Sequence, residues 1–143
     1  MMRFYNPGAL MTTVAPNNTS RNFMRQRGTE ARRRVMGADG AIAAIIFAQR
    51  SGGYGGSKGN SVYTVLQRVN ATPRYVLQFF EADGTQIGST IVENGTSLNG
   101  LATTLASNAN GVYFSLTVYN NTNQATADTG NGFANSTKMS GGA

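Results

Sequence analysis

The side chains that most often carry out catalysis or bind metals are rare in this chain. It has neither histidine nor cysteine, which excludes Ser-His-Asp and Cys-His catalysis, the usual zinc sites and disulfide bonds. Glu81 and Asp83 are two positions apart, so a strand would place both carboxylates on one face. Such a pair can act as general acid and base when burial or the neighbouring charge raises one pKa.

The same carboxylates also fit a purely structural role. The segment EADGTQ is typical of a hairpin turn centred on Asp83-Gly84. We favour the turn, and we expect a protein that is not an enzyme and binds no cofactor or metal ion. A carboxylate or lysine mechanism stays open.

Arginine is the most concentrated chemical group in the sequence. Six arginines lie between Met24 and Asn60, and the guanidinium group binds phosphates and carboxylates through paired hydrogen bonds. Five of them form a cluster at Arg25, Arg27, Arg32, Arg33 and Arg34. This arginine cluster can bind nucleic acid, with Tyr54 in SGGYGGSKGN as a base-stacking ring. That segment does not match a phosphate-binding loop, because Lys58 is not followed by serine or threonine.

An apolar run, AIAAIIFA (41–48), follows the arginines and favours a protein partner. A nucleic-acid-binding tail gains little from it, whereas a docking arm gains roughly 1 kcal/mol or more for each large side chain buried. The predicted apolar anchors are Ile42, Ile45, Ile46 and Phe47. A transmembrane helix needs ~20 apolar residues, so this short run predicts a soluble protein with no membrane partner.

Charge divides the sequence into two parts. Residues 1–58 contain nine basic and two acidic side chains, a net charge of +7, and residues 59–143 contain three basic and four acidic ones, a net charge of −1. Together they give the overall +6. The division predicts a basic, glycine-ended N-terminal arm over 1–58 and a near-neutral β-sandwich domain over 59–143.

Local patterns within the first part are mixed. The segment 29–36 is compatible with a short helix that ends at Gly37. The run 41–48 is compatible with a buried strand or with two helical turns, and both interpretations stay open. The glycines of SGGYGGSKGN predict a flexible linker or hinge loop before the domain.

The second part is typical of β-structure. β-branched and aromatic residues are concentrated in 61–69 and 74–82, and the segment TQIGSTIVE lies between two Xaa-Gly turn signals. The alternation in GVYFSLTVYNN predicts a strand, and 97–110 is compatible with a short helix or a loop. The side chains expected to face the core from that last strand are Val112, Phe114, Leu116 and Val118.

These elements predict a mainly β fold. Four or five strands separated by turns indicate a small antiparallel β-sandwich or barrel-like domain, with an extended basic N-terminal arm. A domain of this size has a marginal core, so we expect a homo-oligomer or an arm that packs on a neighbour.

Two segments resemble the small β-sandwich virion proteins of tailed bacteriophages. The segment PRYVLQFFEADGTQIGSTIVENGTS carries an Arg-Tyr-hydrophobic-Gln strand, formed by Arg74, Tyr75, Leu77, Gln78 and Phe79. The segment NGVYFSLTVYNNTNQAT carries the later glycine-aromatic strand, with Gly111, Val112, Tyr113 and Ser115. The turn common in those proteins is shortened here, and the basic first part has no counterpart in them. The resemblance implies an accessory virion protein, such as a capsid cement or decoration subunit.

Our leading hypothesis is a non-enzymatic structural protein of a phage particle, assembled in the host cytoplasm and located in the virion. Its expected partners are sister subunits in a homo-oligomer and the major capsid protein or another virion protein, bound through the arginine cluster and the apolar anchors. One alternative is a nucleic-acid-binding protein that uses the same basic arm. Another is a receptor- or glycan-binding module with Tyr113 and Tyr119 as surface contacts.

Overall fold

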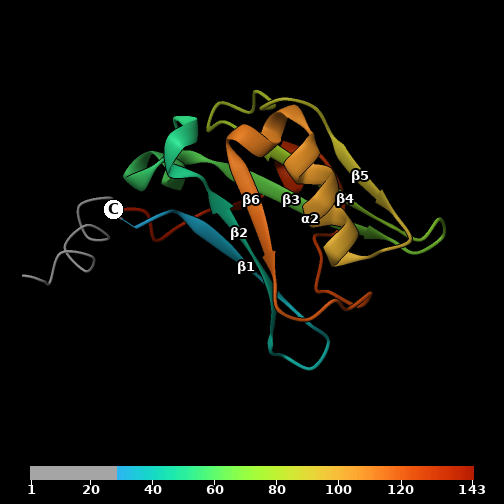
Figure 1. Ribbon diagram of the computed structural model, residues 1–143. Coiled ribbons are helices and arrows are strands. Elements are labelled where there is room, and N and C mark those ends of the chain that lie inside the picture. Colours follow the sequence, from blue (N-terminus) through green and yellow to red (C-terminus); the bar gives the residue numbers. More distant parts are fainter. Residues whose placement is uncertain (1–28) are drawn as a thin grey trace, which may run out of the picture.

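Two antiparallel sheets packed face to face form the fold in the computed structural model, which describes residues 29–143 (Figure 1). One sheet has the strand order β1-β2-β6, and the other has the order β5-β4-β3-β7. The strands are β1 (Arg32–Met36), β2 (Ile42–Ala48), β3 (Tyr63–Val69), β4 (Arg74–Phe80), β5 (Ile91–Asn94), β6 (Phe114–Val118) and β7 (Thr137–Lys138). The predicted mainly β, antiparallel sandwich is confirmed, and within the described residues the sheets do not close into a barrel.

The hairpin of β3 and β4 is the most extensive pairing in the fold. Its register runs without a break from Tyr63↔Phe80 to Val69↔Arg74. Pro73, which lacks a backbone N–H, lies in the turn directly before β4 and cannot extend the ladder. This agrees with the strands expected at 61–69 and 74–82.

One side of the sandwich is closed by the helix α2 (Leu98–Ser107), which packs beside β5 and β6 (Figure 1). The helix begins after Ser97, whose hydroxyl oxygen accepts a hydrogen bond from the Gly100 backbone N–H at 3.1 Å. Its buried residues, at helical spacing, are Leu98, Leu101 and Leu105. Of the two interpretations of 97–110, the helix is therefore the one the structure adopts.

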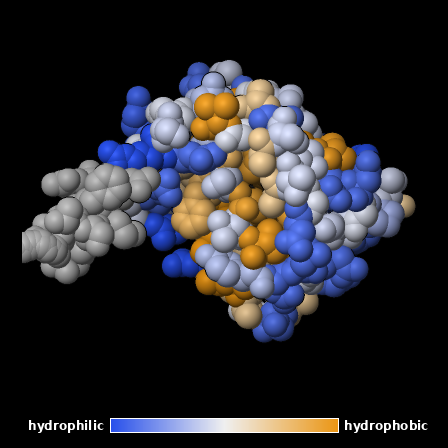
Figure 2. Space-filling model, in the orientation of Figure 1, coloured by the Kyte–Doolittle hydropathy of each residue, from blue (hydrophilic) through white to orange (hydrophobic). Residues whose placement is uncertain are grey.

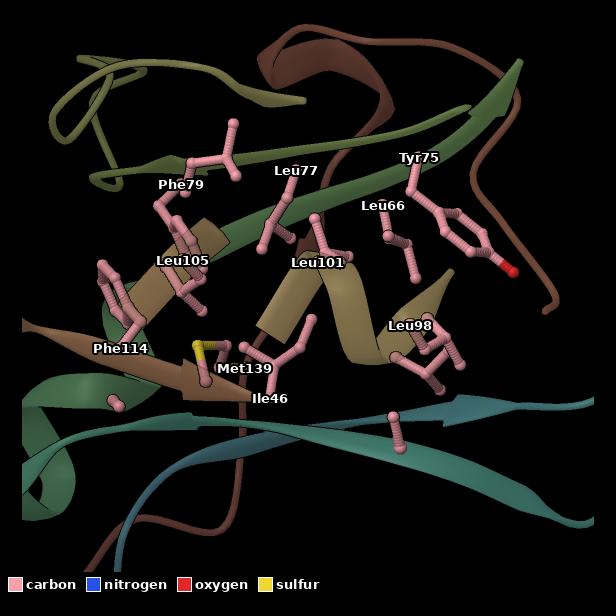
Figure 3. Packing of buried hydrophobic residues seen from close by; sticks show 14 of the residues in the cluster. Ile46, Leu66, Tyr75, Leu77, Phe79, Leu98, Leu101, Leu105, Phe114 and Met139 are labelled. Carbon is pink, nitrogen blue, oxygen red and sulfur yellow. The ribbon is translucent and has the colours of Figure 1, made fainter. Parts of the chain in front are cut away.

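The core joins both sheets, the helix and the C-terminal segment. The rings of Phe79 in β4 and Phe114 in β6 stack with centroids 3.9 Å apart, so one aromatic contact links the two sheets directly. Figure 3 shows Leu105 beside this pair, with Ile46 and Met139 below Leu105 in the view. Each of these five side chains is at most 1% exposed. Burying a large apolar side chain contributes about 1.5–3 kcal/mol, so this cluster holds the layers together.

The C-terminal segment closes the opposite side of the sandwich. Strand β7 pairs with β3 at the edge of the four-stranded sheet. Ser140 then exchanges two backbone hydrogen bonds with Arg32, of 2.8 and 3.1 Å, at the edge of β1. Met139, between these two pairings, is buried in the core. The segment therefore binds both sheets at once.

The described part of the predicted arm belongs to the sandwich. Strands β1 and β2 are two of the three strands of one sheet, and Ala44 and Ile46 are fully buried. A boundary at residue 58 therefore falls inside the folded unit. Residues 1–28 of the predicted arm lie outside the described residues.

The segment 29–36, which is compatible with a short helix in sequence, forms the strand β1 over Arg32–Met36 instead. The backbone of β1 pairs with β2 from Arg32↔Phe47 to Met36↔Ile42, and β2 in turn pairs with β6. The run 41–48 takes its strand interpretation for the same reason. Pairing with partners distant in sequence overrides a weak local preference for helix.

The glycine-rich segment is also folded, as two 3-10 turns, η1 (Arg50–Gly52) and η2 (Gly56–Ser61). Gly59 is buried, and a Cβ atom there would lie 2.7 Å from the Cβ of Ala31. Glycine serves close packing at this position rather than flexibility.

Candidate functional site

The register of β1 and β2 sorts the predicted docking residues onto two sides of the three-stranded sheet. Arg32 pairs with Phe47, and Arg34 pairs with Ile45. Because side chains alternate along a strand, these four lie on the side that faces away from the core. The guanidinium of Arg32 lies over the Phe47 ring, 5.5 Å from its centroid, which is a cation–π contact.

Strand β6 extends this side with two hydroxyl side chains, since Ser115 pairs with Phe47 and Thr117 pairs with Ile45. We call the resulting surface the outer face, and it consists of Arg32, Arg34, Ile45, Phe47, Ser115 and Thr117. Arg34 and Thr117 are exposed, and the other four are half-buried. Figure 2 shows hydrophobic side chains in the middle of the molecule, over β2 and β6, with strongly hydrophilic ones along their border. None of the six residues is acidic.

Arg33, predicted as a docking residue, points to the inner side and ties the two sheets together. Its guanidinium forms a two-bond ion pair with Asp128, with Nη1–Oδ2 and Nη2–Oδ1 distances of 2.8 and 3.0 Å. Nη1 also donates to the carbonyl and hydroxyl oxygens of Thr64, both at 3.0 Å. The Leu66 backbone N–H donates to Asp128 at 2.9 Å. With both side chains only 12% exposed, this ion pair holds β1 to β3 and is not available to a partner.

Asp128 is the residue that sequence reasoning missed here. It lies 95 positions from Arg33, in a polar stretch without periodicity. Nothing in the spacing of the two residues signals that they pair. The arginine cluster therefore looked uniform in sequence, although its members have different roles.

The other predicted docking residues do not lie together in the structure. Ile46 is fully buried in the core. Ile42 is 38% exposed at the start of β2, where the register shifts between Val35 and Met36. Arg25 and Arg27 lie outside the described residues. The structure thus brings together Arg32, Arg34, Ile45 and Phe47.

The predicted surface tyrosines lie at the two ends of β6. Tyr119 is 62% exposed directly after β6. Tyr113 is half-buried, and its ring meets that of Tyr54 edge to face with centroids 5.6 Å apart. Val112, predicted to face the core, is 62% exposed, because η3 (Ala109–Val112) precedes β6 and breaks the alternation.

The paired carboxylates lie in the hairpin turn after β4, as we favoured. The Thr85 backbone N–H donates to Asp83 Oδ1 at 2.9 Å, and this hydrogen bond lowers the pKa of Asp83 below its usual value. The Tyr54 hydroxyl donates to Glu81 at 3.3 Å. A general acid needs a raised pKa, whereas the pKa of Asp83 is lowered. The shallow hollow beside the turn is lined by Tyr54, Ser61, Val62, Glu81, Ala82 and Asp83.

Residues 29–143 contain neither a metal-ion site of acidic side chains nor a membrane-spanning helix. No group of three or more acidic side chains is placed to hold a metal ion there. No helix in this part of the chain is long and apolar enough to cross a membrane.

Comparison of the chain with family models, curated proteins and solved structures finds no match. The resemblance to phage virion proteins stays a prediction, and the outer face is the strongest candidate for a functional surface.

Proposed function

We propose that this protein is a non-enzymatic structural protein of a bacteriophage particle, a capsid cement or decoration subunit or another accessory virion subunit, which docks through its outer face. The observation that carries the proposal is the gathering of two arginines and two large apolar side chains on one side of the three-stranded sheet. The resemblance of the two strand segments to phage virion proteins supports the assignment to a phage particle. The outer face supports docking on another protein.

The outer face combines the two components of a protein interface. Ile45 and Phe47 still expose apolar surface, whose removal from water stabilises a complex by about 25 cal/mol per Å². Arg32 and Arg34 flank them with planar donors that suit carboxylates. Because none of the six residues is acidic, charge complementarity favours a partner with carboxylates around an apolar centre.

The partner best suited to such a face is another protein surface. A phosphate backbone would pair with the two arginines but would gain nothing from burying Ile45 and Phe47. We therefore place a sister subunit first, in a head-to-tail homo-oligomer in which the outer face contacts a different surface of the next subunit, and the major capsid protein or another virion protein second.

Sedimentation velocity of the full chain, after nuclease treatment and at low and high salt, tests the docking. We expect a defined oligomer that withstands high salt, because its contact is largely apolar. The combined substitutions Ile45→Ser and Phe47→Ser should give a monomer with an unchanged far-ultraviolet circular dichroism spectrum. Val112→Ser, which changes a side chain 62% exposed outside the outer face, is the matched control and should leave the oligomer intact.

Two outcomes would overturn docking to a sister subunit. One is a full chain that stays monomeric at every concentration. The other is association that nuclease or salt removes, which would favour the nucleic-acid-binding alternative. Mass spectrometry of purified particles tests the location separately, since absence of the chain from them contradicts the virion assignment alone.

A further inference from the structure

The loop between β2 and β3 forms a second candidate site, with lining residues that are not part of the outer face. This loop borders an open hollow of about 410 Å³ on the surface. We call it the basic hollow, and it is lined by Arg50, Gly53, Gly55, Gly56 and Lys58. Its walls are thus backbone and two cationic side chains, with no carboxylate among the lining residues.

Within residues 29–143, both cations are without a side-chain partner. Arg50 and Lys58 are exposed, and neither side chain takes part in an ion pair or hydrogen bond with another described residue. The backbone oxygen of Ala143 lies 3.0 Å from the position that a Cβ atom on Gly56 would take, and the acidic side chain in contact with this loop is Glu30. Its carboxylate accepts a hydrogen bond from the Arg50 backbone N–H at 3.1 Å, so it is engaged by the backbone.

The hollow has a fixed shape, unlike a flexible glycine linker. Gly53 and Gly56 have φ angles of 92° and 60°, which favour glycine. A Cβ atom on Gly55 would lie 2.8 Å from the Arg50 carbonyl oxygen, so the turn excludes larger residues there. The Asn60 side chain fixes the end of the loop by exchanging hydrogen bonds of 2.9 and 2.8 Å with the backbone of Gly142.

We propose that the basic hollow binds a phosphate group. A guanidinium presents paired donors to a tetrahedral oxyanion, and an ammonium adds a compact positive charge. Nothing lies within 4 Å of the position that a Cβ atom on Gly53 would take, so an anion can approach the backbone closely there. The phosphate can be a free inorganic ion or a group of a single-stranded nucleic acid, and the chemistry of recognition is the same for both. The proposal does not depend on docking by the outer face.

Titration of the full chain followed by ¹H–¹⁵N nuclear magnetic resonance tests this site. Sodium phosphate should shift the amide signals of Gly53, Gly55 and Gly56 with saturation, whereas sodium chloride at equal ionic strength should not. Combined Arg50→Gln and Lys58→Gln should weaken phosphate binding at least about tenfold, as expected from losing charge-assisted hydrogen bonds. Lys138→Gln is the matched control, because it removes an exposed positive charge from β7 and should leave binding unchanged.

A short oligothymidylate distinguishes the two sources of phosphate. Binding at least about tenfold tighter than that of inorganic phosphate, lost in the double variant, would identify nucleic acid as the source. Equal or weaker binding would identify the free ion. Shifts that sodium chloride reproduces, or that survive in the double variant, would overturn the proposal.

Discussion

The two sheets of the sandwich cover their outward sides differently. In the four-stranded sheet, Val65, Val76 and Phe80 face away from the main core and are still at most 5% exposed. The ring of Phe133, in the turn η4 (Phe133–Asn135), packs edge to face against the ring of Phe80 with centroids 5.8 Å apart. In the three-stranded sheet, the residues of the outer face are half-buried or exposed.

The comparison shows that alternation along a strand does not by itself decide what is buried. Both sheets turn large side chains outward, and in one of them a segment from far along the chain covers those side chains. Residues 29–143 provide no such cover for the three-stranded sheet, and this is the surface that we propose for a partner. Substitutions on adjacent residues of the three-stranded sheet can sharpen this contrast.

The largest effect is expected from adjacent isoleucines in β2. Ile46→Ala creates a cavity in the core and should lower the free energy of unfolding by about 3 kcal/mol. Ile45→Ala removes the same atoms from the half-buried outer face and should cost less than about 1 kcal/mol. Urea unfolding followed by circular dichroism measures both values. Equal costs would mean that the outer face is as well packed as the core, and the contrast between the sheets would fail.

An intermediate effect is expected from adjacent arginines in β1. Arg33→Ala leaves Asp128 without its ion-pair partner at a site only 12% exposed, and should cost about 2 kcal/mol. Arg34→Ala, on the exposed side, should change stability by less than about 0.5 kcal/mol. A double-mutant cycle of Arg33→Ala with Asp128→Ala measures the coupling. A coupling energy near zero would contradict the role of this pair in joining the sheets.

The smallest effect concerns pH and the covered sheet. The buried Tyr75 hydroxyl donates to the Thr122 carbonyl oxygen and accepts from the Ala125 N–H, both at 3.1 Å, and Figure 3 shows it pointing out of the cluster. Burial raises the pKa of Tyr75 above its ordinary value of 10.0. The unfolded chain therefore releases this proton first, so the stabilisation is complete below pH 10.0 and is lost as pH rises through the folded-state pKa.

Chemical denaturation between neutral and alkaline pH measures this loss. Tyr75→Phe should flatten part of the decline, and Tyr54→Phe should flatten a smaller part, because burial and the charge of Glu81 raise the pKa of Tyr54 too. Tyr119→Phe, at a ring 62% exposed after β6, is the matched control. An alkaline decline that Tyr75→Phe leaves unchanged would contradict this assignment.

Much of the β-structure was predictable because its signals are local. Pro73 in the turn between the two strands, and the β-branched and aromatic residues of 61–69 and 74–82 on either side of it, specify the hairpin of β3 and β4 within a short window. The place of β1 and β2 was not predictable in this way. Their strand form depends on pairing with each other and with β6, which lies far along the chain.

The same distinction between local signals and long-range packing applies to the candidate site. The sequence by itself determined that the chain lacks histidine and cysteine, and that arginine and isoleucine are concentrated in one stretch. Only the tertiary structure decided that Arg33 binds Asp128 while Arg34 is exposed, and that Ile46 fills the core while Ile45 does not. The physical reason is that composition and local period are properties of neighbouring residues, whereas burial and ion pairing depend on which distant segment packs against each side of a strand.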